Sequence, residues 1–246
     1  MKKALLVLFS LLYLAVGFVS TYHAIEFFTL SNASWLAVIL AIAFEVGQAT
    51  VLFSLLTSKD KSKIILYAAG KVNDELNLPD STIEITESAF AGVRYLKKIK
   101  IGKKLTKIGR NAFPKCRSLE KISVDEGNEV FSSVDGNLYN KDKSVLIQYA
   151  IGKSDSTLDI PKTVKLIDDS ACLGAKRLVE VILPPSLREI SHYAFYGCES
   201  LSKIHGGKGL SYIGECAFDG CENLIELKIP KTVDFISDWA FSGCSS

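Results

Sequence analysis

LPPSLREISHYAFYGCESL (183–201) is followed 23 residues later by GGKGLSYIGECAFDGCENL (206–224) and then by IPKTVDFISDWAFSGC (229–244). IPKTVKLIDDSACLGAKRL (160–178) precedes them at the same spacing. A fixed period of this length is typical of repeat proteins, in which each unit is one structural element of a stack. The period therefore decides the fold before any single residue is considered.

The repeat has well-filled columns. The aromatic column contains Phe90, Phe113, Phe195, Phe218 and Phe241, with Cys172 in the same place. An alanine precedes each of these residues, an isoleucine stands five residues before each, and a leucine closes five of the six units. A cysteine column follows the aromatic column by three residues and contains Cys116, Cys198, Cys221 and Cys244. One such unit cannot bury its apolar face alone, so stacking of units into a continuous core is expected.

Local patterns indicate the elements within each unit. The pieces 76–78, 99–101, 158–160 and 227–229 alternate apolar and polar residues, which predicts short strands. Prolines follow these pieces and would end the strands, because proline lacks a ladder donor. The A-F-x-G-C segments predict helical turns. The fold class expected for residues 58–246 is a leucine-rich-repeat-like β-solenoid of short strands and helical turns.

The 23-residue period is interrupted once. Residues 58–122 align with 140–204 at an offset of 82 residues, and one longer unit lies between them. Asp135-Gly136 in that unit is a strong turn signal for a two-residue β-hairpin loop. The interpretation is a β-hairpin insert at about 128–153 that bulges from the solenoid.

These motifs resemble the BspA-type leucine-rich repeats, and the resemblance covers residues 58–246. It implies a solenoid, with inserts like the hairpin above, in a surface or secreted protein that adheres to host proteins or other cells.

Two apolar runs occupy residues 1–57, at about 4–22 and 35–56. As helices they would span about 28 and 33 Å, close to a bilayer core of about 30 Å. They predict two transmembrane α-helices before the solenoid. The first run could instead be a cleaved signal peptide, although its cleavage signal is poor.

The second run carries polar residues near its middle. Glu45 and Gln48 would be costly to expose to lipid, and Gly47 forms a small-residue pair with Ala43. Glu45, Gln48 and Gly47 are therefore candidates for helix pairing, within the hairpin of helices or between copies in a homo-oligomer.

The densest charged segment is KKIKIGKKLTKIGR (97–110), whose basic residues are Lys97, Lys98, Lys100, Lys103, Lys104, Lys107 and Arg110. One interpretation is a solvated face of the solenoid. The other is a binding patch for anionic lipid headgroups or an acidic partner. No aromatic platform interleaves with these residues, and the net charge of the chain is only +2, so nucleic acid is not an expected partner.

The remaining residues do not predict chemistry. The cysteine column falls at equivalent positions of the repeat, which favours small buried hydrophobic groups over disulfides or metal ligands. Cys216 lies outside the column and is expected to be partly exposed. No nucleophile with a base and no phosphate-binding glycine loop is found, so no enzyme activity, metal or cofactor is expected.

Two functions fit these features. The first is a membrane-anchored recognition module, adhesin-like, whose repeats bind a protein or glycan partner. The second is a structural, oligomerising membrane protein with the solenoid as a spacer or intracellular scaffold. The resemblance places the repeats at the cell surface. The positive-inside rule places them in the cytoplasm, because Lys2, Lys3 and three lysines after residue 58 flank the apolar runs.

Overall fold

The computed structural model describes residues 54–57, 62–68 and 74–244. Leu55–Ser246 forms one compact unit. The first predicted membrane helix lies outside the described residues, as do Glu45, Gly47, Gln48 and most of the second helix. Residues 54–56, assigned above to the end of the second helix, instead belong to strand β1, Ser54–Thr57. Within the described part of the chain, no helix is long and apolar enough to cross a membrane.

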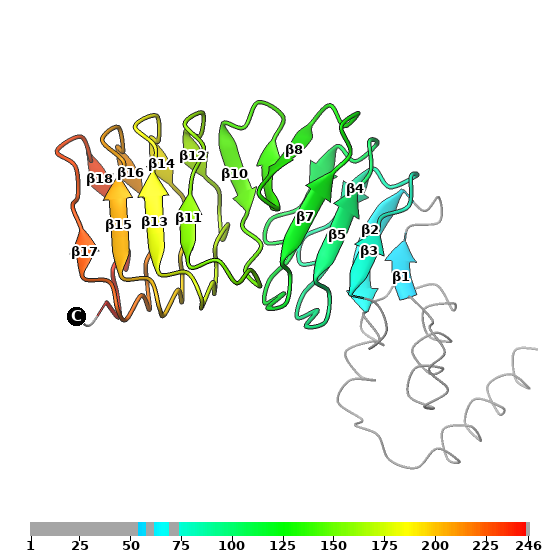
Figure 1. Ribbon diagram of the computed structural model, residues 1–246, viewed down its shortest axis with the longest axis horizontal. Helices are drawn as coiled ribbons and strands as arrows, with labels where there is room; N and C mark the ends of the chain where they lie inside the picture. The colour runs from blue at the N-terminus through cyan, green and yellow to red at the C-terminus, as the bar shows by residue number, and fades with distance from the viewer. Residues whose placement is uncertain (1–53, 58–61, 69–73, 245–246) are drawn as a thin grey trace, which may run out of the picture. The chain divides into compact units, whose positions relative to one another are not determined.

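The compact unit is a β-solenoid (Figure 1). Most turns of the solenoid, called coils below, contribute a strand of three or four residues to one sheet and a two-residue strand to another. The longer strands form the sheets β3-β5-β7 and β11-β13-β15-β17, called here the long-strand sheets. Their bounds are β3 Glu75–Asn77, β5 Lys98–Ile101, β7 Lys121–Val124, β11 Thr157–Asp159, β13 Glu180–Leu183, β15 Lys203–Gly206 and β17 Glu226–Leu227. Each of the four predicted strands overlaps an observed one that begins one residue earlier, and β17 shares only Leu227 with the predicted piece 227–229.

The other strand of each coil forms the short-strand sheets, β1-β2-β4-β6 and β18-β16-β14-β12-β10-β9-β8. Figure 1 shows these behind the longer strands. Their bounds, besides β1, are β2 Lys63–Ala68, β4 Glu84–Ile85, β6 Lys107–Ile108, β8 Phe131–Val134, β9 Asn137–Asn140, β10 Val145–Gln148, β12 Leu166–Ile167, β14 Glu189–Ile190, β16 Tyr212–Ile213 and β18 Phe235–Ile236.

The strand register follows the sequence period. Leu158 pairs with Val181, Val181 with Ile204, and Ile204 with Leu227, all in parallel. In the short-strand sheet Ile167 pairs with Ile190, and Ile190 with Ile213. Because equal repeat positions pair, each apolar column becomes a continuous ladder through the core.

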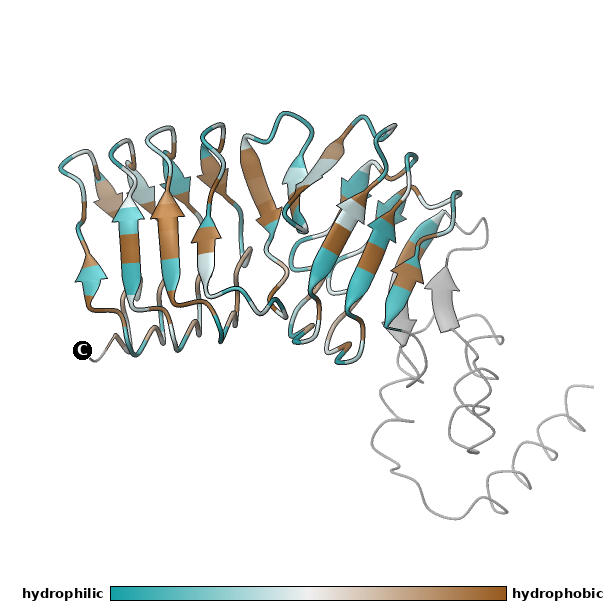
Figure 2. Ribbon diagram, in the orientation of Figure 1, coloured by the Kyte–Doolittle hydropathy of each residue, from teal (hydrophilic) through white to brown (hydrophobic). Residues whose placement is uncertain are grey.

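The ladders fill the space between the sheets. Phe90, Phe195 and Phe218 have no exposed surface, and Phe113 has 2%. Phe241 in the last coil is only partly buried. The apolar centres of the front strands are visible in Figure 2. The buried side chains form two clusters: the first ends at Leu138 and the second begins at Tyr139.

The A-F-x-G-C segments are hydrogen-bonded turns with no assigned helix, so the helical turns expected from the sequence are not confirmed. Alternate backbone N–H groups bond to the neighbouring coil: the amide of Phe195 donates to the carbonyl of Ala217 at 2.8 Å, and that of Phe218 to Ala240 at 2.8 Å. The amides between them bond within the turn, as that of Tyr196 does to the carbonyl of Tyr193 at 3.1 Å. A helix would require those amides for bonds within the segment. The residue before each alanine also has a positive φ, between 47° and 60°, which interrupts helical geometry.

The hairpin insert lies within the solenoid and does not bulge from it. β8 and β9 are antiparallel across Asp135-Gly136, where φ is 49° and 76°. β10 then pairs antiparallel with β9 and parallel with β12, so the insert extends the short-strand sheet. Leu138 and Tyr139 on β9 are 0% and 1% exposed. Burial of these two side chains holds the hairpin inside.

Candidate functional site

A groove lies along the turns that follow the short strands β6, β12, β14 and β16. It is called the junction groove here, because it bridges the two core clusters, and its volume is about 270 Å³. Its lining consists of Arg110, Asn111, Asp169, Ser170, His192, Tyr193 and Glu215. These residues occupy two adjacent columns of the repeat, so the solenoid places a different side chain at the same point of each coil.

The backbone of these turns directs the side chains outward. Asn111, Ser170 and Tyr193 have φ of 47°, 59° and 57°. This left-handed conformation is unfavourable for residues other than glycine, by about 1–2 kcal/mol each. It recurs in all six coils, which indicates that bonding between coils imposes it.

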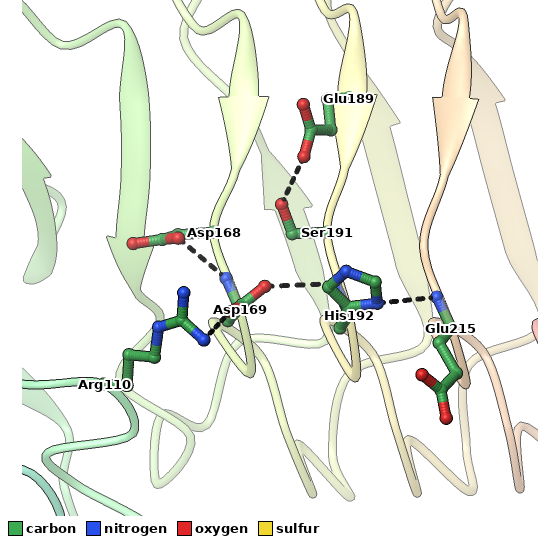
Figure 3. A network of polar contacts seen from close by, with 7 residues as sticks. All are labelled: Arg110, Asp168, Asp169, Glu189, Ser191, His192 and Glu215. Carbon is green, nitrogen blue, oxygen red and sulfur yellow. Dashed lines mark hydrogen bonds and ion pairs between the residues drawn. The ribbon is translucent and has the colours of Figure 1, made fainter. Parts of the chain in front are cut away.

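A network of polar contacts connects the groove residues (Figure 3). Arg110 Nη1 lies 3.6 Å from Asp169 Oδ2, and the other oxygen of Asp169 accepts the backbone N–H of His192 at 3.2 Å. The backbone N–H of Glu215 donates to His192 Nδ1 at 3.0 Å. In this arrangement His192 Nδ1 is an acceptor, so the proton of the neutral ring is on Nε2.

Carboxyl groups dominate the electrostatics of this region. Burial raises the pKa of the Asp168 carboxyl, and the charges of Asp169 and Glu189 raise it further, while Arg110 opposes them. Asp168 also lines a smaller cavity of about 60 Å³ that adjoins the groove, together with Gln148 and Phe113. The negative charge of Glu215 is the largest cause of a raised pKa at Tyr193. Anionic groups are thus close enough to perturb one another.

Aromatic rings flank the carboxylates. Tyr193 and Tyr196 are 38% and 41% exposed, and their ring centroids are 5.9 Å apart. His192 meets the edge of Tyr212 at 6.3 Å, and Tyr212 stacks on Phe235 at 5.8 Å. Exposed rings beside charged groups are features of a recognition surface.

The site has the composition of a binding surface. Among the residues that the structure describes, no group of three His, Cys, Asp or Glu side chains is placed to hold a metal ion. The groove offers carboxylates, one guanidinium, one imidazole and exposed rings. These groups provide charge complementarity and stacking for a ligand.

The basic run at 97–110 does not lie on one face. Lys97, Lys98 and Lys100 lie at β5 in a long-strand sheet, whereas Lys107 lies on β6 in a short-strand sheet. The chain turns between them, so the run divides between two sheets. Arg110 belongs to the junction groove.

Acidic partners reduce the charge of the run. Lys97 pairs with Asp74 at 2.9 Å, Lys98 pairs with Glu75, and Lys107 pairs with Glu84 at 3.0 Å. Each acid lies 23 residues earlier, on the preceding coil. Lys100, Lys103 and Lys104 are exposed and have no ion pair within the described residues. The run taken alone contains no acid, and only the stacking of coils reveals the pairing.

The cysteines form a column beside the aromatic ladder. Cys116, Cys198 and Cys221 have no exposed surface, and Cys244 is intermediate. All six cysteines are free thiols. Cys216, expected to be partly exposed, is buried, with 9% exposure.

Sequence reasoning missed the junction groove. Asp168 and Asp169 appear in the sequence as a pair of acids in a variable turn. The available signal was the column Arg110, Asp169, His192 and Glu215, all two residues before the alanine column. The surface that they form depends on which coils are neighbours. The hairpin-bearing coil interrupts the 23-residue period between Arg110 and Asp169, so the sequence does not show that these two residues lie close together.

Comparison with known proteins gives the family. The model of the BspA type leucine rich repeat region matches residues 67–145 and 150–246, with six copies. No curated protein matches the chain.

Solved structures with the same fold include one described as a cell surface protein. A leucine rich cell surface protein from Faecalibacterium prausnitzii A2-165 is 34% identical with a TM-score of 0.60, over 68% of this chain and 44% of that one. The pneumococcal vaccine antigen PcpA is 30% identical with a TM-score of 0.59, over 66% of this chain and 46% of that one. The leucine rich repeat protein of T. pallidum is 25% identical with a TM-score of 0.51, over 78% and 86%.

The match to this chain spans less than half the length of the first two proteins. The family model, in contrast, covers most of the present chain. The chain belongs to the BspA-type leucine-rich repeat family.

Proposed function

We propose that this chain is a membrane-anchored recognition module, adhesin-like, which binds a protein or glycan partner through the junction groove. The observation that carries the proposal is the groove itself, a surface of unlike polar and aromatic side chains on an otherwise regular solenoid. If the groove served only to stack the coils, the same residue type would be expected at this position in each coil. The relative described as a cell surface protein supports a surface role for the repeats.

The anchor is part of the same proposal and rests on the two apolar runs at 4–22 and 35–56. Lys100, Lys103 and Lys104 are candidates for contact with anionic headgroups, because other lysines of the basic run already have acidic partners. Glu45, Gly47 and Gln48 are proposed for helix pairing.

Binding is tested with the purified full-length chain on arrays of soluble proteins and oligosaccharides. Tyr193→Ser is a suitable groove variant, since serine occupies the same column at Ser88 and Ser170. Glu226→Gln is the matched surface control, because Glu226 lies on β17 in the long-strand sheet. Saturable binding that Tyr193→Ser weakens and Glu226→Gln leaves unchanged supports the proposal. Absence of saturable binding, or equal binding by both variants, rejects it.

The side of the membrane is tested separately. External protease added to intact cells should digest the repeats if they are displayed at the surface. Digestion only after the cells are opened would exclude the adhesin-like placement and would favour an intracellular scaffold.

A further inference from the structure

Several carboxylates of the solenoid pair with a base on a neighbouring coil. On the long-strand sheets, Lys98 pairs with Glu75, Lys203 with Glu226 at 3.6 Å, and His205 lies 3.1 Å from Glu180. In the first short-strand sheet, Glu84 lies between Lys63 at 2.7 Å and Lys107 at 3.0 Å. Stacking thus sets these acids beside a base, whereas other exposed acids, such as Glu87 and Glu126, have no ion pair within the described residues.

Five carboxylates lie on or just after the strands β12, β14, β16 and β18 of the second short-strand sheet. Glu189, Glu215 and Asp238 have no ion pair within the described residues, and Asp168 and Asp169 share a single guanidinium, that of Arg110. Glu215 and Asp238 occupy the same column in adjacent coils, so their charges repel. With five carboxylates and one guanidinium, this side of the second short-strand sheet carries a net negative charge.

Arg110, the one arginine or lysine among the described residues that line the groove, is held loosely. Arg110 Nη1 is 3.6 Å from Asp169, and 83% of the Arg110 side chain is exposed. Glu189 accepts only the hydroxyl of Ser191, at 2.8 Å. The groove therefore has room and charge for a further cation beside Arg110.

Aromatic faces border the same carboxylates. Tyr193 is exposed and lies in the groove, and Tyr212 lies on the strand that leads to Glu215. A cation over a tyrosine ring gains about 0.5–1 kcal/mol at an exposed site. Carboxylates that lie beside aromatic rings suit an arginine or lysine side chain. A guanidinium can stack on the ring and at the same time donate hydrogen bonds to the carboxylates.

We infer that the junction groove recognises a basic peptide segment of a partner protein, with an arginine or lysine side chain seated between Asp169, Glu215 and the Tyr193 ring. The inference rests on the proposed function and specifies the partner's chemistry. Charge complementarity selects this occupant over a neutral glycan, since a neutral sugar would leave the carboxylates uncompensated. A metal ion is a poorer occupant, because no group of three described ligands converges.

The probes are a short peptide of alternating glycine and arginine, its glycine–glutamate counterpart, and a neutral oligosaccharide. Each is titrated against the purified full-length chain, with affinity measured at low and physiological salt. The arginine peptide should bind saturably, and its affinity should fall as salt screens the charges. The glutamate peptide and the oligosaccharide should not compete.

Variants assign the binding to the groove. Asp169→Asn and Glu215→Gln should each weaken the arginine peptide about tenfold, since each removes one carboxylate from the proposed seat. Arg110→Gln should strengthen binding, because the variant removes the competing guanidinium. Glu226→Gln removes the same charge from the opposite sheet and should leave the affinity unchanged. Thermal unfolding of each variant checks that the fold is retained.

Equal weakening by Glu215→Gln and Glu226→Gln would overturn the inference, because the effect would then be net charge alone. Competition by the oligosaccharide, or tighter binding of the glutamate peptide, would also overturn it. A partner from the arrays that requires Tyr193, together with no binding of the arginine peptide, would retain the proposed function and reject this inference.

Discussion

The thiol of Cys198 donates a hydrogen bond to the carbonyl oxygen of Cys172, with 3.2 Å between sulfur and oxygen. The same contact joins Cys116 to Phe90 at 3.0 Å, Cys221 to Phe195 at 3.2 Å and Cys244 to Phe218 at 3.2 Å. Each bond connects one coil to the preceding one, from the cysteine column to the aromatic column. The cysteines therefore link neighbouring coils and do not act as isolated space-filling groups.

The buried thiols should make the fold sensitive to alkali. Burial raises the pKa of Cys116 from 9.0 to about 12. The unfolded thiol loses its proton above pH 9.0 while the folded thiol keeps it, so this contribution to stability is lost as pH rises from 9.0 towards 12. Urea unfolding of Cys116→Ala should show a shallower decline over that range, by up to about 1 kcal/mol per pH unit. An identical slope in the variant and the parent would contradict the assignment.

Close approach between coils should make Gly152 intolerant of a side chain. A Cβ at Gly152 would lie 2.3 Å from the backbone carbon of Ser118. Gly152→Ala should therefore cost about 3 kcal/mol or more, measured by urea unfolding.

Gly197→Ala is the matched control. Gly197 has φ of 64°, and a Cβ there would meet nothing within 4 Å. Only the left-handed backbone penalty applies, about 1–2 kcal/mol. Equal losses at the two glycines would show that contact between coils at Gly152 is unimportant.

The aromatic ladder should be most sensitive at its interior. Phe195 is fully buried and stacks on Phe218, with ring centroids 5.3 Å apart and planes 3° apart. Phe195→Ala should lower the free energy of unfolding by about 3–5 kcal/mol, because it leaves a cavity between coils. Phe241→Ala should cost less, since Phe241 is only partly buried. A larger loss at Phe241 would refute this ordering.

Glu84 should contribute to stability above its usual pKa and not in acid. Hydrogen bonds from Lys63 and then Lys107 lower the pKa of Glu84 below 4.5. The unfolded carboxyl takes up a proton before the folded one, so this contribution is lost as pH falls below 4.5. Thermal unfolding of Glu84→Gln should depend less on pH in that range. Glu87→Gln, at an exposed site two residues after β4, is the control and should retain the parental dependence.

Much of the solenoid could be predicted from the sequence because its period is a local property. The spacing of Phe195, Phe218 and Phe241 determines that equal positions stack, and the observed register repeats that spacing. Alternation indicated four strands of the long-strand sheets to within about one residue, but it did not predict the two-residue strands such as Glu189–Ile190. The helical turns are not confirmed, because alternate amides of the turn bond to the next coil, and a single unit contains no signal for that choice.

Charge pairing and the junction groove were decided only by the tertiary structure. Lys98 meets Glu75 through stacking by one coil, and Arg110 meets Asp169 across the hairpin-bearing coil. The position of that coil depends on burying Leu138 and Tyr139 in the core, a packing result that the turn signal at Asp135-Gly136 does not contain. The sequence by itself thus determined the stack, because a periodic apolar pattern can be buried in only one register. The binding surface required the tertiary structure, because its side chains come from coils whose adjacency arises only on folding.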